Sequence, residues 1–214
     1  MSTQQPPSSL TERRKAATQL DIAHAAAELF AVRGPDATTA EEIARRAGVA
    51  LRTFYRYFRS KQDAVSPLLA AGADRWRALL AAAEPGTGLL RALEAAVEQS
   101  LAAPDEEAAG ALLRTRGLLR AAEDDPALRA VWYRVNQESE ERLVPVVARL
   151  ADGRLEALQV RLIAAAATDA IRIALETWAG TDADVTGDGS PSTLALRCLR
   201  QLLGGMEGRV AADE

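Results

Sequence analysis

The sequence predicts an all-α protein, with three N-terminal helices followed by a larger helical region. Apolar residues recur at helical spacing along most of the 214 residues, and no segment alternates apolar and polar residues as strands do. In addition, the spacing in segment 39–61 describes two short helices joined by a turn at Gly48. Breaks in the pattern divide the chain into a flexible arm (1–10), a three-helix unit (11–60) and a helical unit (61–214).

The first two helices have clear start and stop signals. A long helix over 11–33 follows the polar, proline-bearing arm and stops at Gly34. The second helix starts at Thr39, because Glu42 three positions later completes a capping box, and it ends at Gly48. We expect a glycine there because the turn demands a positive φ.

The third helix has a buried face and an exposed face of different chemistry. Val49, Phe54 and Phe58 are spaced to fill the core shared with the second helix. The outward residues suit the major groove of DNA and its phosphates, since Arg pairs with guanine, Leu and Thr contact thymine methyl groups and Tyr donates to phosphate. They are Ala50, Leu51, Arg52, Thr53, Tyr55 and Arg56. The same pattern also fits an ordinary helical hairpin, in which these side chains only cover a surface.

The charge distribution favours the DNA interpretation. Segment 39–61 has six basic and two acidic residues, although the whole chain has a net charge of -4. Residues 1–60 sum to nine basic minus six acidic, or +3, and residues 61–214 to seventeen minus twenty-four, or -7. Phosphates would attract the first part and repel the second, so only the N-terminal unit is expected to meet DNA.

Residues 12–65 resemble the TetR family of bacterial transcriptional regulators. The first helix ending at Gly34, the Ile-Ala and Ala-Gly-Val groups after Thr39, and the later Thr-Phe-Tyr, Tyr-Phe and Ser-Lys groups carry this resemblance. It implies a helix-turn-helix DNA-binding domain, a C-terminal helical domain for ligand binding and dimerisation, and a palindromic operator in double-stranded DNA. It also implies phosphate contacts from Thr39, Tyr55, Tyr57 and Lys61, and base-edge contacts from Leu51, Arg52, Thr53 and Arg56.

Two residues of the third helix depart from the family pattern. Family members often have Ser or Thr at Ala50 and Gly at Arg52. Ala50 cannot cap the helix or offer a hydroxyl to phosphate, whereas Arg52 adds a long donor. We therefore expect an operator that differs from those of relatives.

The C-terminal unit begins with a linking helix and ends with a helical pair. A capping box between Ser60 and Asp63 predicts that the linking helix starts at Ser60, and its apolar pattern continues to about Ala83. The final pair is expected over 155–178 and 191–203, on either side of a loop rich in glycine and aspartate.

The final pair is the candidate dimer interface. A single helix-turn-helix contacts too few bases for useful specificity, so a homodimer that binds two half-sites is expected. Both helices have broad apolar stripes, which could form a four-helix interface with a second copy, as in the family. The interface residues expected on this basis are Ile163, Ala167, Ile171, Leu175, Leu196, Leu199 and Leu203. Taken alone, the stripes fit the core of a monomer equally well.

Aromatic residues gather in the same unit and suggest a cavity for a small apolar or aromatic effector. Nearby polar residues could orient it. The candidate ligand residues are Trp76, Leu112, Arg116, Leu119, Trp132, Tyr133, Asn136, Thr168 and Arg172. Each of them also fits an ordinary core or surface position.

Other classes of function fit the sequence less well. The only histidine, His24, lies within a helical pattern, and no Glu-x-x-His pair or Gly-rich phosphate loop is present, so no catalytic residue, metal site or cofactor is expected. A non-specific architectural DNA binder would lack the acidic C-terminal unit. No stretch reaches the length of a membrane helix and no signal peptide begins the chain, so we expect a cytoplasmic protein.

Together these features predict a homodimeric repressor that a small, largely apolar ligand releases from its operator. The ligand would move the linking helix and shift the two recognition helices away from a spacing of about 34 Å, one turn of DNA. The alternative is a constitutive or protein-controlled regulator without a small-molecule pocket.

Overall fold

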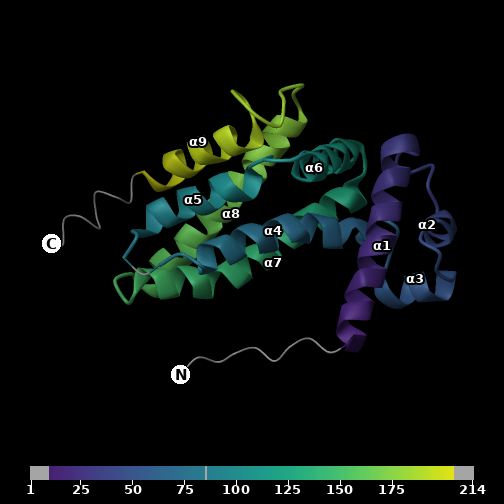
Figure 1. Ribbon diagram of the computed structural model, residues 1–214, viewed down its shortest axis with the longest axis horizontal. Helices are drawn as coiled ribbons and strands as arrows, with labels where there is room; N and C mark the ends of the chain where they lie inside the picture. Colours follow the sequence, from purple (N-terminus) through teal and green to yellow (C-terminus); the bar gives the residue numbers. More distant parts are fainter. Residues whose placement is uncertain (1–9, 85, 205–214) are drawn as a thin grey trace. The chain divides into compact units, whose positions relative to one another are not determined.

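A computed structural model of the chain describes residues 10–84 and 86–204 (Figure 1). Every regular element within these two ranges is a helix, which confirms the all-α prediction. The elements are α1 (Leu10–Arg33), α2 (Ala40–Arg46), α3 (Leu51–Tyr57), the 3₁₀ helix η1 (Asp63–Val65), α4 (Ser66–Ala81), α5 (Leu89–Leu101), α6 (Glu106–Asp124), α7 (Pro126–Ala151), α8 (Ala157–Ala179) and α9 (Pro191–Leu203). The arm expected at residues 1–10 lies, except for Leu10, outside the described residues.

The chain forms two compact units, and the division between Leu68 and Leu69 lies inside α4. One unit contains α1 to α3 and η1, and the other contains most of α4 and all of α5 to α9. The sequence placed a boundary eight residues earlier, at residue 60. No helix in the described ranges is long and apolar enough to cross a membrane.

The first unit has a small aromatic and aliphatic core. Its fully enclosed side chains include Ile22, Ile43 and Phe54, and Phe30 and Phe58 are almost as buried. Burial of side chains of this size supplies about 1.5–3 kcal/mol each, which is the main reason that such short helices hold their shape. Leu20 of α1 is 40% exposed, although it lies one helical turn from the fully buried Ala23.

The linking helix begins later than the sequence predicted. The Ser60 hydroxyl accepts the backbone N–H of Asp63 at 3.0 Å, but the carboxylate of Asp63 accepts the N–H of Arg59, at 3.2 Å. The Asp63 carboxylate thus bonds to Arg59 and not to Ser60, and the predicted box is followed by the 3₁₀ turn η1. Helix α4 starts at Ser66, and Pro67 suits its first turn.

The second unit is built on the pairing of α8 with α9 and of α7 with α8 (Figure 1). Its enclosed residues include Leu93 on α5, Leu143 on α7, Trp178 on α8 and Leu199 on α9. The predicted range 191–203 matches α9, and α8 lies within two residues of its predicted range.

The loop between α8 and α9 is held by side chains from α6 and α8. Arg120 donates to the carbonyl of Ala179 at 2.7 Å and to that of Thr181 at 2.8 Å. The indole N–H of Trp178 donates to Ala183 at 3.0 Å. The bond to Ala179 satisfies a carbonyl that α8 leaves without a donor at its end, and the bonds to Thr181 and Ala183 hold the loop that follows.

Candidate functional site

The helix-turn-helix begins with the predicted capping box. The Thr39 hydroxyl accepts the N–H of Glu42 at 3.2 Å, and the carboxylate of Glu42 accepts the N–H of Thr39 at 2.9 Å. Arg33 of α1 also donates to this carboxylate, at 2.9 Å. The Thr39 N–H, and after it the Arg33 guanidinium, hold the pKa of Glu42 below its ordinary value. The start of α2 is thus held by hydrogen bonds between Thr39 and Glu42 and by a hydrogen bond from Arg33 of α1.

The turn between α2 and α3 is a Schellman motif centred on Gly48. Its φ is 68°, as the sequence predicted, and its N–H donates to the carbonyl of Arg45 at 3.2 Å. The next N–H, that of Val49, donates to Ala44 at 2.9 Å. Ala50 then starts α3 without a side-chain cap, in agreement with the expectation from its missing hydroxyl.

The two faces of α3 differ in burial as the spacing predicted. Phe54 is fully enclosed, and its ring centroid lies 5.7 Å from that of Phe58. On the other face, Arg52, Tyr55 and Arg56 are exposed, and Leu51, Thr53 and Tyr57 are half-buried. The predicted DNA-contacting side chains of α3 are therefore all at least partly accessible.

The two arginines of α3 differ in how far they are engaged. Arg56 donates to the Tyr57 hydroxyl at 3.1 Å, and its guanidinium lies 4.8 Å from the centre of that ring. By contrast, Arg52 forms no hydrogen bond or ion pair with any residue that the structure describes. Arg52 thus has all five of its donors available to a base edge.

Lys61, a predicted phosphate contact, also has a role within the unit. Its ammonium donates to the carbonyl of Pro35 at 2.7 Å and lies 3.4 Å from that of Asp36. These carbonyls belong to the connection between α1 and α2. An ammonium has three donors, so at least one remains for a phosphate.

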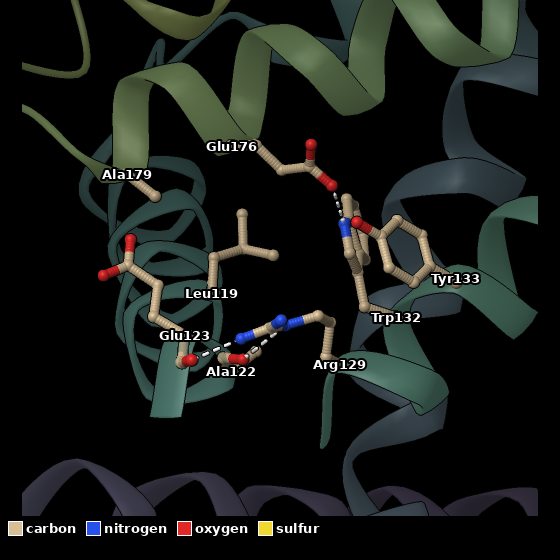
Figure 2. Close-up of a pocket in the computed structure, with 8 residues that line it drawn as sticks. All are labelled: Leu119, Ala122, Glu123, Arg129, Trp132, Tyr133, Glu176 and Ala179. Atoms are coloured by element: carbon tan, nitrogen blue, oxygen red, sulfur yellow. Dashed lines mark hydrogen bonds between the residues drawn. The ribbon is translucent and has the colours of Figure 1, made fainter. Parts of the chain in front are cut away.

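The second unit has a pocket of about 230 Å³ between α6, α7 and α8 (Figure 2). Three of the nine predicted ligand residues line it: Leu119, Trp132 and Tyr133. The other lining residues, which sequence reasoning missed, are Ala122, Glu123, Arg129, Glu176 and Ala179. Each lies three or four positions from another lining residue on the same helix, so the helical repeat was the signal that could have found them.

The remaining predicted ligand residues have other roles. Arg116 stacks on Trp178 with its guanidinium carbon 3.8 Å from the ring centre, Asn136 donates to the carbonyl of Trp132 at 2.9 Å, and Trp76 is buried in α4. Leu112 is half-buried, and Thr168 is buried with a hydroxyl that has no hydrogen-bond partner. None of these lines the pocket.

Glu176 is the polar centre of the pocket. One of its oxygens accepts the indole N–H of Trp132 at 2.7 Å, and the other accepts Arg172 at 3.0 Å. Arg172 also donates to Asp169 at 2.9 Å and lies over Tyr133, 5.7 Å from the ring centre. Burial acts to lower the pKa of Arg172, but its bonds to Asp169 and Glu176 outweigh that effect and raise it above its ordinary value.

The predicted dimer residues are mostly buried within a single chain. Leu196 is half-buried, and the other six lie buried within a single chain: Ile163, Ala167, Ile171, Leu175, Leu199 and Leu203. The packing of α8 on α9 accounts for them, because the two helices are in extensive contact. The large apolar side chains that these helices leave exposed are Leu158, Leu162, Ile173 and Leu202.

The sequence is similar to those of bacterial regulators. Residues 22–65 match the family described as bacterial regulatory proteins, tetR family. The chain is also 31% identical, over 143 residues, to the HTH-type transcriptional regulator TcmR of Streptomyces glaucescens. This match covers 65% of the chain and spans 62% of the length of TcmR.

Solved structures share the fold along nearly the whole chain. NalD of Pseudomonas aeruginosa, the secondary repressor of the MexAB-OprM multidrug efflux pump, is 22% identical with a TM-score of 0.57, and the match covers 90% of this chain and 97% of NalD. Thermus thermophilus FadR, a repressor solved in complex with lauroyl-CoA, is 24% identical with a TM-score of 0.56, and the match covers 88% and 94%.

Proposed function

Because the chain belongs to the TetR family of bacterial transcriptional regulators, we propose that it is a homodimeric, sequence-specific repressor that a small ligand releases from its operator. The observation that carries this proposal is the accessible face of α3. It presents Arg52, Tyr55 and Arg56 on a helix held from behind by Phe54 and Phe58. A rigid short helix with donors on one face is what direct contact with a major groove requires. The family is one of regulators, so no enzymatic activity is assigned.

Dimerisation is proposed through exposed residues of α8 and α9. Leu158, Leu162 and Ile173 are separated by four and eleven positions, so they lie along one face of α8. Exposed apolar side chains aligned in this way are typical of a surface that a partner covers. A second copy is the partner that the family suggests, and it would supply the second recognition helix for a palindromic operator.

The pocket favours control by a small ligand. The alternative was a constitutive or protein-controlled regulator without a small-molecule pocket. It combines aromatic walls from Trp132 and Tyr133 with a few polar groups, as small-molecule sites do. FadR, which shares the fold, was solved with a bound small molecule, lauroyl-CoA. The effector of this chain is proposed to be different and smaller, because about 230 Å³ is below the range of about 300–1,000 Å³ typical of drug-sized ligands.

Helix α7 gives a route from the pocket to α4. It contributes Trp132 and Tyr133 to the pocket, and further along Arg142 pairs with Asp74 of α4 at 3.6 Å. Near its end, Arg149 donates to the carbonyl of Ala81, in the last turn of α4, at 2.7 Å. A ligand that displaces α7 would therefore pull on α4, which begins in the DNA-binding unit.

The proposal can be tested by selecting duplexes from a random DNA library with the full chain. We expect an inverted repeat whose half-sites lie about one or two helical turns apart. Failure to enrich any sequence above random DNA would contradict sequence-specific repression.

Ligand control is tested by filling the pocket. Leu119→Trp should abolish release from the selected duplex by an effector, because Leu119 lines the pocket, and should leave DNA affinity nearly unchanged. Leu112→Trp, on the same helix but outside the pocket, is the matched control and should keep the response. Equal responses from the two variants would favour constitutive or protein-controlled regulation.

A further inference from the structure

The pocket between α6, α7 and α8 offers few free hydrogen-bond donors. Arg129 donates to the carbonyl of Ala122 at 3.0 Å and also to that of Glu123, so its guanidinium is engaged at the end of α6 (Figure 2). The indole N–H of Trp132 is engaged by Glu176 at 2.7 Å. Among the side chains that line the pocket, the Tyr133 hydroxyl and the remaining guanidinium N–H groups are the donors left.

Acceptors, by contrast, are in surplus. Each oxygen of Glu176 holds one hydrogen bond, and a carboxylate accepts about four in all. Glu123 is exposed to solvent, its carboxylate forms no hydrogen bond or ion pair with any described residue, and Figure 2 shows it on the opposite side of the pocket from Trp132. Helices α6 and α8 also end here, at Asp124 and Ala179, but Arg129 and Arg120 already donate to their terminal carbonyls, so the two glutamates supply the remaining acceptors.

The walls suit a positively charged group as well. Trp132 and Tyr133 are consecutive residues that both line the pocket, and the faces of both ring types attract cations. The chain itself places a cation in this way, since Arg172 lies 5.7 Å from the centre of the Tyr133 ring and pairs with Glu176. A ligand cation would meet the same two kinds of partner.

We propose that the effector is a small organic cation: a protonated amine or quaternary ammonium group attached to one ring or a short alkyl chain. This rests on the proposed function and narrows it. The apolar body contacts Leu119 and Trp132, and the cationic head is directed to the carboxylates of Glu123 and Glu176. The sequence had suggested a largely apolar effector, and the two carboxylates that line the pocket together with Trp132 and Tyr133 are the observation that changes this.

Three soluble probes of nearly equal size separate charge from shape: benzylammonium, benzyl alcohol and benzoate. Each is titrated into the full chain at fixed ionic strength while the indole N–H resonance of Trp132, assigned with Trp132→Phe, is followed by NMR. Benzylammonium should bind at least about tenfold more tightly than benzyl alcohol, and benzoate more weakly than either. Equal affinity for the three probes, or tighter binding of benzoate, would overturn the proposal without any variant.

Variants then locate the charge. Glu123→Gln and Glu176→Gln should each weaken the binding of benzylammonium at least about threefold and leave the affinity for benzyl alcohol unchanged. The glutamine at 176 still offers an oxygen to Trp132. Glu107→Gln, an exposed glutamate in the first turn of α6, is the matched control and should change neither probe. Loss that is no greater in the two pocket variants than in the control would overturn the assignment.

Failure of the ligand class is distinguishable from failure of the proposed function. If benzylammonium occupies the pocket but never lowers affinity for the selected duplex, the cation site stands and ligand-controlled repression is contradicted. If benzyl alcohol or benzoate releases the duplex and benzylammonium does not, repression stands and the cationic effector is overturned.

Discussion

Trp132 donates its indole N–H to a carboxylate oxygen of Glu176 at 2.7 Å, and this bond joins α7 to α8 beside the pocket. The indole is almost fully buried, so its N–H is largely shielded from water. Leaving a buried donor without a partner costs more free energy than the hydrogen bond itself contributes to stability. The pair therefore connects stability of the second unit with the chemistry of its pocket.

Removing this acceptor should destabilise the protein. Glu176→Ala leaves the buried N–H of Trp132 without a partner, and we expect a loss of about 1–3 kcal/mol in the free energy of unfolding. Glu176→Gln retains an oxygen acceptor and should lose clearly less. Urea titration followed by circular dichroism measures both, and equal losses would show that the hydrogen bond contributes nothing specific.

Arg52 should determine operator preference. Because it is exposed and unengaged among the described residues, Arg52→Ala should cost about 1–3 kcal/mol per half-site on the selected duplex and little on random DNA. Arg56→Ala is expected to act in the same direction. Arg91→Ala, an exposed arginine of α5, serves as control. Fluorescence anisotropy at fixed salt gives the affinities, and equal losses on both DNAs would reassign these arginines to phosphate contacts.

Lys61 should act on both folding and DNA binding. Lys61→Met removes the donor to Pro35, with an expected loss of about 1 kcal/mol in stability. It should also reduce the slope of log affinity against log salt by about one per half-site. Tyr55→Phe, which removes an exposed neutral hydroxyl, should weaken binding to all DNA without changing that slope. A slope unaffected by Lys61→Met would limit this lysine to holding the α1–α2 connection.

Two glycine-to-alanine substitutions should change the stability of the protein in opposite directions. Gly48 has a φ of 68° and nothing within 4 Å of an added Cβ, so Gly48→Ala should cost about 1–2 kcal/mol through the backbone alone. Gly117 lies inside α6 and also has nothing within 4 Å, so Gly117→Ala should stabilise by about 0.5–1 kcal/mol. Thermal unfolding compares them. Stabilisation by Gly48→Ala would contradict the role of the left-handed turn.

Exposed and buried leucines of the last two helices should respond differently to charge. Leu162→Glu or Ile173→Glu should produce folded monomers, because these side chains are exposed on one chain. Leu199→Glu should unfold the second unit, because Leu199 is completely buried. Sedimentation and circular dichroism distinguish the two results. Unchanged dimers of Leu162→Glu and Ile173→Glu would place the interface elsewhere.

Local interactions explain which parts of the structure could be predicted. The capping box of Thr39 and the turn at Gly48 involve residues three to five positions apart, so their sequence signals specify their geometry directly. The same logic failed at Ser60, because the carboxylate of Asp63 accepts the N–H of Arg59 and the chain forms a 3₁₀ turn first. Spacing identifies a cap, but it does not determine which turn follows.

Long-range packing explains what could not be predicted. An apolar stripe shows that a helix face is covered, but it does not show whether the cover is the same chain or another, and Leu199 proved to be covered by its own chain. The pocket depends on three helices, and Glu123 and Glu176 are brought to it from positions 53 residues apart. Isolated glutamates on helices are usually solvated, so the helical repeat alone did not distinguish these two from ordinary surface residues.

The division of α3 into a supporting face and an exposed face bears on how such a regulator can diverge. Phe54 and Phe58 form the buried packing, whereas Arg52 is exposed and forms no hydrogen bond or ion pair with a described residue. If the exposed residues contact the operator as proposed, substitutions there change the DNA sequence that is bound at small cost in folding. A duplicated gene could then acquire a new set of target promoters while the residues of its second unit stayed the same.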